Sequence, residues 1–472
     1  MITIVYYYTM KRTCTVEFRK ALLNLYPGLA DNWGHWRHMS RLCFAQDYSK
    51  VPIGIYQVAR DYRVLDDLIR HRFIALKFIK EFKQNVLSYQ VSSYSPVRHI
   101  CRHASFKPSP ELSNLISKEL TNFDKRAKRC FIDNGRLVSK NNLKILKEED
   151  LKLSHLYLSL SNTPPIILKF MTYLNRLPSN RFSKVIDRLP LACEALFDTD
   201  SNGNPIVNPN CYMDQLNILQ QVREQAQPIY LPSLTGNTVR FFEVNRGLQS
   251  VHSYLRDILT EHWIELDLQN AHLAIVAKLW EIPYLQEILS TGKSIWEIIM
   301  PTLGMNPLDK ESKSNLKTLL YSAVYGMSQN QIVLHAERTL GEKKEVFLSH
   351  PIITEILKAK SRVLKTLASK EEHITSLGVK HNPYSFMKNG IYNSNHLSII
   401  SEEISEYEAL LLEPIFDLAI ETKQFVITLY QYDGVSIEPR DNRRRDSILK
   451  KIKKAVDERA KELDIHTTIT VK

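Results

Sequence analysis

Two runs of β-forming residues near the C-terminal end constrain the fold more tightly than any other feature of this sequence. Residues 425–430 (FVITLY) and 435–438 (VSIE) are rich in β-branched and aromatic side chains, and only the residues QYDG separate them. So short a connection between two such runs predicts a β-hairpin. The hairpin would hold the carboxylate of Asp433 near its turn, at the edge of a sheet rather than beneath it.

A second acidic residue has a similar setting further up the chain. Residues 263–266 form a short apolar run that predicts a strand leading into Asp267, and residues 271–280 predict an apolar helix. A single aspartate at the end of a strand is usually a cap or turn residue. Two on adjacent strands, however, could hold two divalent ions about 3.5–4 Å apart, as in phosphoryl transfer. Mg²⁺ favours such a site, where substrate phosphates join a few carboxylates as ligands.

One predicted helix carries cations and aromatic rings on a single face. Lys313, Lys317, Tyr321 and Tyr325 are spaced by four residues within the helical run 310–326, so they lie near one side of the helix. Such a face could bind a triphosphate and stack against a base. By spacing alone, it could equally be a surface helix with a partly buried tyrosine pair.

Strands and helices interleaved in this way indicate an α+β fold. A long helix is expected over residues 398–421, where Pro414 should kink or divide it. An amphipathic helix over 446–463 and a closing strand over 467–471 follow the hairpin. Three regions are predicted: a module of unknown role in residues 1–60, a basic and mostly helical region in 61–228, and an α+β region in 229–472.

The balance of charge indicates a polyanionic partner. The 472 residues include 63 lysines and arginines against 51 acidic residues, a net charge of +12. Nucleic acid and an anionic membrane both fit such an excess. Residues 60–190 hold most of it, with about 25 cations against about 12 acids. The cluster KRAKR at 125–129, within an expected helix over 111–128, is either a solvated helix face or a surface that follows phosphates.

Signals for a membrane or for secretion are absent from the sequence. No stretch of about 20 apolar residues occurs. The six cysteines are scattered without a CxxC pair, and the apolar run at the N-terminus has no charged segment before it. These features predict a protein of a reducing compartment, the cytoplasm or an organellar matrix, that is neither secreted nor embedded in a membrane.

Three segments, taken in order, resemble the motifs of family A nucleic-acid polymerases, the bacterial DNA polymerase I type. Residues 267–275 (DLQNAHLAI) resemble motif A, residues 313–326 resemble motif B (K-x-x-x-F/Y-G-x-x-Y-G), and residues 431–438 (QYDGVSIE) resemble motif C, a hairpin that usually carries H-D-E. The spacing agrees, with about 50 residues from A to B and about 115 from B to C. Residues 283–296 resemble the family's link between motif A and the fingers. The resemblance covers roughly residues 230–472.

The resemblance implies a right-hand polymerase, with an antiparallel-sheet palm and helical fingers in residues 229–472 and the basic region upstream in the position of a thumb. It implies that Asp267, Asp433 and the Leu268 carbonyl bind two Mg²⁺ ions, with Mn²⁺ as an alternative. Lys317 would contact the triphosphate and protonate the leaving pyrophosphate. The other nucleotide-binding residues implied are Lys313 at a phosphate-binding arginine position, Tyr321 and Tyr325 as stacking rings, and His272 beside the sugar.

A surface for the primer–template is implied as well. The segment before residue 250 resembles the part of the family that contacts the primer–template, and the basic cluster upstream would hold a duplex by its phosphates. The nucleic-acid contacts expected are Thr235, Arg240, Arg246 and Gln249 in the first of these, and Lys125, Arg126, Lys128 and Arg129 in the second.

The motifs depart from the family pattern at three points. Motif C has Tyr432 and Gly434 where His and Glu are usual, which weakens the support for metal or for the primer terminus. His272 replaces the glutamate that acts as a sugar gate in DNA-synthesising members. Because RNA-synthesising relatives have a small residue there, a bulky histidine favours deoxyribonucleotides. Ser322 replaces a glycine and should change only packing.

We therefore expect a template-directed DNA polymerase that adds dNTPs to a primer 3′-hydroxyl by two-metal-ion nucleotidyl transfer in DNA replication. No DxE-type exonuclease motif is evident, so proofreading is not expected. The expected partners are a DNA primer–template and dNTPs, with no membrane, and a monomer is assumed. Two alternatives stay open: an RNA polymerase or primase-like enzyme on the same fold, and a catalytically weak nucleic-acid-binding replication protein.

Overall fold

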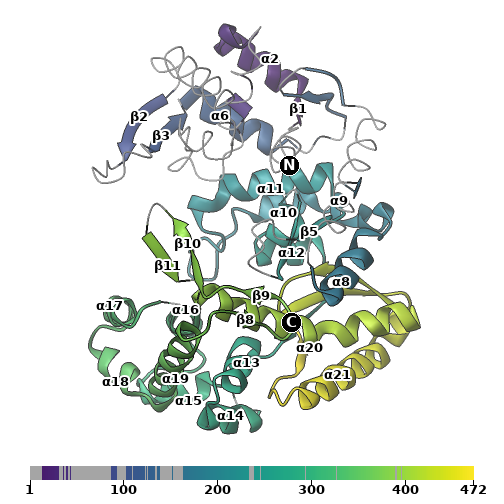
Figure 1. Ribbon diagram of the computed structural model, residues 1–472. Coiled ribbons are helices and arrows are strands. Elements are labelled where there is room, and N and C mark those ends of the chain that lie inside the picture. Colours follow the sequence, from purple (N-terminus) through teal and green to yellow (C-terminus); the bar gives the residue numbers. More distant parts are fainter. Residues whose placement is uncertain are drawn as a thin grey trace. The chain divides into compact units, whose positions relative to one another are not determined.

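The computed structural model describes residues 13–30, 36, 39–40, 43, 87–92, 103–108, 110–122, 124, 126–132, 135–138, 151–152, 163–232, 239–244, 246–292, 294–325, 327–388, 391–394 and 396–472. In these ranges helices predominate and the strand pairs with a given register are antiparallel, so the α+β class is confirmed (Figure 1). None of the helices described there has both the length and the apolar composition needed to cross a bilayer.

The chain forms two compact units and alternates between them. The first draws on residues 1–154, 177–229 and 243–261, and the second on residues 155–176, 230–242 and 262–472. Helix 165–175, which the sequence assigned to the basic region, is therefore part of the second unit. The role of the basic region as a thumb stays a prediction.

The first unit is mainly helical. Its two small sheets pair β1 with β4 and β2 with β3, and among its helices α10 packs against α12 and α11 against α6. Its described elements are β1 (Thr13–Thr15), α2 (Val16–Leu25), β2 (Leu87–Ser92), β3 (His103–Pro108), α6 (Pro110–Leu120), β4 (Arg129–Phe131), α9 (Ser183–Asp187), α10 (Leu189–Ala195), α11 (Tyr212–Glu224) and α12 (Ser253–Leu259).

The helix expected over residues 111–128 is shorter than predicted. Helix α6 ends at Leu120, and the side chains of Asn122 and Asp124 accept hydrogen bonds from backbone N–H groups two residues further on. Such side chains compete with the helix for the backbone and favour a turn. The basic cluster at 125–129 thus follows a helix and enters strand β4. Residues 66–84, where the sequence also predicts a helix, lie outside the described residues.

A four-stranded antiparallel sheet lies at the centre of the second unit. Its strands are β7 (Ile264–Leu268), β12 (Phe425–Tyr430), β13 (Gly434–Pro439) and β14 (Ile469–Val471), in the order β12-β13-β7-β14. The predicted hairpin is β12–β13, and the predicted closing strand is β14. Strand β7 alternates between buried and half-buried residues, as expected of a strand with one face against a core.

Helix α20 (His396–Thr422) is the main support of this sheet. It packs against β12, α8 (Pro165–Asn175), α13 (Ala271–Leu279) and α21 (Arg445–Glu462). The rings of Phe170 and Phe416 stack with their centroids 3.8 Å apart, which joins α8 to α20. Of the two effects expected of Pro414, a kink or a division, division does not occur, because α20 is continuous through this residue.

The outer strand of the sheet is covered by side chains. All six residues of β12 are buried, and the N–H groups of Ile427 and Tyr430 donate to the hydroxyls of Tyr173 and Tyr230. The Tyr430 ring also stacks on Phe241, 4.2 Å between centroids. An edge strand whose N–H groups are already bonded cannot recruit a further strand.

Helix α16 (Lys310–Tyr325) packs among other helices of the second unit. Helix α16 packs against α17 (Gln329–Leu340), α19 (Pro351–Ala368) and α20 (Figure 1). The other described elements are α14 (Pro283–Ser290), α15 (Trp296–Thr302), α18 (Lys344–Ser349), β5 (Tyr230–Pro232), β6 (Phe241–Glu243), β8 (His373–Ile374), β9 (Lys380–His381), β10 (Tyr384–Lys388) and β11 (Ile391–Ser394).

A buried lysine fixes the end of α16. Lys360 of α19 is 6% exposed, and its ammonium donates to the carbonyls of Ala323 and Met327, at 2.7 and 2.9 Å. These are carbonyls at and beyond the last turn of α16, which have no partner within the helix. Burial lowers the pKa of Lys360 to about 8.

We expect Lys360→Met to lower the free energy of unfolding by about 1–3 kcal/mol, because it leaves two buried carbonyls without a donor. Urea denaturation followed by circular dichroism measures the loss. Lys365→Met, on an exposed position of the same helix, is the matched control and should change stability by less than about 0.5 kcal/mol. Equal stability of the Lys360 variant and the unsubstituted protein would contradict this role.

Candidate functional site

Of the two aspartates singled out in the sequence, Asp267 lies in strand β7 and Asp433 lies in the hairpin turn directly before the neighbouring strand β13. Asp267 in β7 is paired with Gly434 in β13, so Asp433 is next to it across the ladder. The Leu268 N–H donates to the Asp433 carbonyl at 2.9 Å, which fixes this register. A residue's N–H and C=O point to the same side of a strand, so the Leu268 carbonyl also faces the Asp433 side. The fold thus brings together all three predicted metal ligands.

Asp267 and Asp433 are two like-charged carboxylates in a partly buried environment. Burial, then the nearby charges of Asp267 and Glu408, raise the pKa of Asp433 to about 6. Burial also raises the pKa of Asp267, although the cations Lys472 and Lys317 work against this rise. Two like charges that burial penalises are relieved when a cation binds between them.

These donors suit Mg²⁺ better than a metal ion that takes all of its ligands from the protein. In the described part of the chain, no group of three or more His, Cys, Asp or Glu side chains could hold a metal ion. Mg²⁺ is commonly bound through one or two carboxylates and substrate phosphates, with water completing its shell. Asp267, Asp433 and the Leu268 carbonyl match that pattern, and a substrate would have to supply the rest.

A lysine at the end of β14 faces the same pair. The Lys472 ammonium lies 2.8 Å from Glu265 Oε1 and 3.4 Å from Asp267 Oδ2. It is therefore on the face of the sheet that carries Glu265 and Asp267. Strand β14 pairs with β7 so that Thr470 is opposite Asp267. This ammonium would compete with a metal ion for Asp267.

Removing that charge should make the site easier to fill. We expect Lys472→Met to lower the Mn²⁺ concentration for half-saturation by about threefold or more, because one nearby positive charge no longer repels the ion. Calorimetric titration of the metal-free protein measures the affinity. Lys461→Met, an exposed change on α21, serves as the control. Weaker metal binding by the Lys472 variant would mean that the lysine organises the carboxylates instead.

Helix α16 and helix α13 supply the other wall of the site. The Tyr321 ring meets the His272 ring edge-on at 5.7 Å, and the Lys317 ammonium lies 5.7 Å from the centre of the Tyr321 ring. Burial, followed by the charges of Asp433 and Asp267, raises the pKa of Tyr321 to about 12. Lys317 is exposed and close enough to Asp267 to influence it. These residues therefore adjoin the aspartate pair.

Two further residues of the predicted face are less informative. Lys313 lies one turn before Lys317 and is half-buried. Tyr325 is the last residue of α16, and its side chain lies outside the described part of the structure, as does Gly326. The predicted nucleotide contacts of Lys313 and Tyr325 stay predictions.

The hairpin turn accounts for one of the two departures from the motif that residues 431–438 resemble, the glycine at position 434. Tyr432 has a positive φ of 69°, a strained conformation for a bulky residue, and its ring lies under the Arg240 guanidinium at 5.1 Å. A Cβ at Gly434 would lie 2.4 Å from the Leu266 carbonyl oxygen and 3.0 Å from Asp267 Oδ1. Glycine is therefore the residue that lets β13 approach β7 here. The absence of Glu at this position is a packing requirement of this sheet.

One residue of the site was not found from the sequence. Glu408 of α20 is 1% exposed, contacts His272 Nε2, and lies 3.4 Å from Arg240. A signal was present, because Glu408 is on the stripe of apolar residues that includes Ile404 and Leu411. A charge on such a stripe suggests a buried ion pair. Lys472, by contrast, follows the last strand, where the sequence offers no cue.

The predicted primer–template residues divide between the units. Arg240 belongs to the second unit and joins the site through Glu408 and Tyr432. Arg246 and Gln249 belong to the first unit, where the Arg246 guanidinium forms a two-point ion pair with Asp214, at 2.8 and 3.0 Å. The Gln249 side chain accepts from the Glu243 N–H. Thr235 lies outside the described residues.

The basic cluster is only partly available for phosphates. Arg126 and Lys128 are exposed, and Lys125 lies outside the described residues. The Arg129 side chain is 11% exposed and pairs with Glu224 at 3.0 Å and Glu119 at 3.5 Å. A guanidinium held between two carboxylates is not free to bind a phosphate, so the structure favours a structural role for Arg129.

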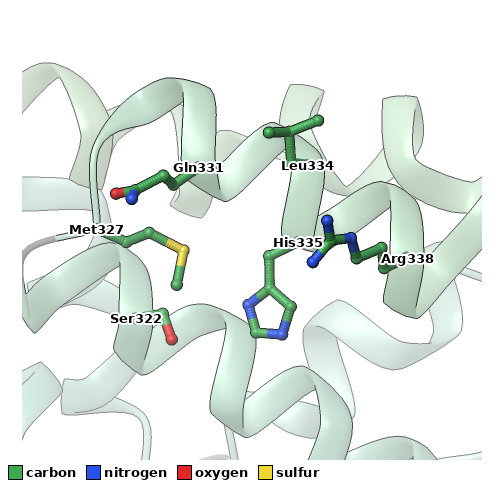
Figure 2. A pocket seen from close by; sticks show the side chains of 6 residues that line it. All are labelled: Ser322, Met327, Gln331, Leu334, His335 and Arg338. Carbon is green, nitrogen blue, oxygen red and sulfur yellow. The ribbon is translucent and has the colours of Figure 1, made fainter. Parts of the chain in front are cut away.

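A cavity of about 650 Å³ lies beside α16 and α17. Figure 2 shows that the Met327 side chain, the His335 ring and the Arg338 guanidinium extend into the space between these helices. Ser322, Gln331 and Leu334 complete its lining. None of the acidic residues of the site lines it, so this cavity is distinct from the aspartate pair.

No protein-family model and no curated protein matches this chain. Among solved structures, it is similar to the POL domain of Pol1 from M. smegmatis, in complex with DNA primer-template and dNTP, with 9% sequence identity and a TM-score of 0.44. The alignment covers 93% of this chain and 80% of that one. The chemistry of this chain has to be inferred from its own residues.

Proposed function

We propose that the second unit is a template-directed DNA polymerase that transfers nucleotides to a primer 3′-hydroxyl. One observation carries the proposal: Asp267 of β7 lies beside Asp433, the residue directly before β13, next to the Lys317 and Tyr321 face of α16. A pair of adjacent carboxylates facing a cation and an aromatic ring suits a nucleoside triphosphate. In this proposal the sheet is the palm, the helices around α16 are the fingers, and the basic region upstream is the thumb.

Each residue then has a defined part. Asp267, Asp433 and the Leu268 carbonyl would hold Mg²⁺, which neutralises the charge that develops on the transferred phosphate. Lys317 would bind the triphosphate and give a proton to the leaving pyrophosphate. Tyr321 would stack on the incoming base, with its hydroxyl kept protonated by the raised pKa. Catalysis would consist mainly of positioning and charge neutralisation.

The experiment is primer extension with Mg²⁺, in which dNTPs and NTPs are supplied in parallel. We expect extension with dNTPs and much slower extension with NTPs, because His272, whose ring meets Tyr321, would lie beside the sugar in this proposal. Extension that starts on an unprimed template would favour a primase-like enzyme. Binding of primed DNA without incorporation, under Mg²⁺ and Mn²⁺ alike, would overturn the proposed function in favour of a binding protein.

A further inference from the structure

Glu408 contacts two residues that adjoin the aspartate pair. Its carboxylate contacts the His272 ring with Oε1 and lies 3.4 Å from the Arg240 guanidinium with Oε2. The three residues come from α20, α13 and the segment before β6. A single buried side chain thus fixes two groups that are far apart in the sequence.

Burying a charged carboxylate such as that of Glu408 is unfavourable unless the charge is paired. A carboxylate that is 1% exposed loses its hydration, and a cation and hydrogen-bond donors must replace it. Arg240 supplies the cation here, and the His272 ring contacts the other oxygen of the carboxylate. Because each partner is held at one atom of the carboxylate, the orientation of the imidazole ring is tied to the position of α20.

The two residues that Glu408 contacts, His272 and Arg240, lie next to different parts of the site. The His272 ring meets Tyr321 on the α16 side, whereas the Arg240 guanidinium covers the Tyr432 ring at the hairpin turn. A nucleotide with its α-phosphate at the carboxylates and its base on Tyr321 would place its sugar next to His272. A side chain can exclude a 2′-hydroxyl only if it cannot rotate out of the way.

We propose that Glu408 is a positioning residue that holds His272 against the sugar of the incoming nucleotide and thereby sets the preference for deoxyribonucleotides. This inference rests on the proposed function. The ring itself meets the sugar, and Glu408 acts through the ring.

The test compares Glu408→Gln, which keeps the shape and removes the charge, with Glu408→Asp, which keeps the charge. Glu406→Gln is the matched control, because Glu406 is on the same helix, is 0% exposed, and accepts hydrogen bonds from Thr375, Ser376 and the Leu377 N–H. The measurement is the ratio of kcat/KM for a dNTP to that for the matching NTP in primer extension.

We expect Glu408→Gln to lower this ratio about tenfold or more, Glu408→Asp to restore part of it, and Glu406→Gln to leave it unchanged. A change of this size is expected when the 2′-hydroxyl of an NTP gains access to the site. An unchanged ratio in Glu408→Gln, or an equal change in Glu406→Gln, would overturn the inference.

A second measurement needs no catalysis. In ¹⁵N-histidine-labelled, metal-free protein, Glu408→Gln should shift the ring nitrogen signals of His272, and Glu406→Gln should not. Unshifted signals would overturn the contact that carries the inference. If the unsubstituted protein extends no primer, the proposed function fails and the sugar role fails with it. If it extends primers but the ratio is unchanged in Glu408→Gln, the sugar role alone fails.

Discussion

Replacing Asp433 with asparagine will abolish nucleotide incorporation and at the same time stabilise the metal-free protein. The loss arises because one of two adjacent carboxylates no longer attracts the cation, and we expect incorporation to fall by at least about 10³-fold. The gain arises because Asp433 is a carboxylate that the fold holds in an unfavourable place. Burial and its acidic neighbours raise its pKa from 3.8 to about 6.

The direction of the stability change follows from the proton balance. Between pH 4 and 6, roughly, the folded protein holds a proton on Asp433 that the unfolded chain has lost, so stability falls as the pH rises through this window. At pH 7 the whole penalty is present. Asparagine carries no charge, and the variant should gain about 1–3 kcal/mol at that pH and little at pH 4.

Thermal unfolding in EDTA at pH 4.5 and at pH 7 measures this difference, alongside primer extension. Asp464→Asn is the control, since Asp464 is exposed and pairs only with Lys278 at the surface among the described contacts. That variant should keep its activity. Normal extension by Asp433→Asn would remove the aspartate pair from the chemistry, and a lower melting temperature at pH 7 would show that Asp433 is favourably paired in the fold.

Adding a side chain at Gly434, including the glutamate that is usual in the polymerase motif that this segment resembles, will destabilise the protein. A Cβ there would lie 2.4 Å from the Leu266 carbonyl oxygen, a backbone atom that cannot rotate away. We expect Gly434→Ala to lower the free energy of unfolding by about 1–3 kcal/mol, the usual size of overpacking effects, and Gly434→Glu to lower it further. Because β13 must move away from β7, Asp433 moves away from Asp267, and incorporation should fall with stability.

Gly292→Ala separates this effect from the general effect of replacing glycine. Its added Cβ would meet nothing within 4 Å, although its φ of +70° is unfavourable for alanine by about 1–2 kcal/mol. It should lose stability but keep full incorporation per folded molecule. If Gly434→Glu were active, the sheet would have to open at this point, and the packing explanation of motif C would be wrong.

Local patterns carried most of what could be predicted. The hairpin around Asp433, the strand before Asp267 and the face with Lys317 and Tyr321 depend on alternation, short connections and spacing by four residues. Each is a property of a few consecutive residues. The pairing of β7 with β13 joins segments more than 150 residues apart. Only the order of the motifs, through their resemblance to a family, indicated that pairing.

The failures come from contacts that a local pattern does not contain. Arg129 belongs to a basic cluster, yet its partner Glu224 is distant in the sequence and becomes its neighbour only in the fold. Glu408 has the spacing of a core residue, and its charge is explained by Arg240, from another segment. Gly434 was interpreted as a lost functional group, whereas the limit is the space beside Leu266.

The stack of Phe170 on Phe416 has a practical consequence for any attempt to produce residues 229–472 alone. A fragment cut at residue 229 would retain both aspartates and α16 but would lack α8, which carries Phe170 and the Tyr173 hydroxyl that binds β12. The bare surface of α20 and β12 would then face water. During synthesis on the ribosome, α8 is likewise without its packing partners for a time, because it emerges long before α20 and β12.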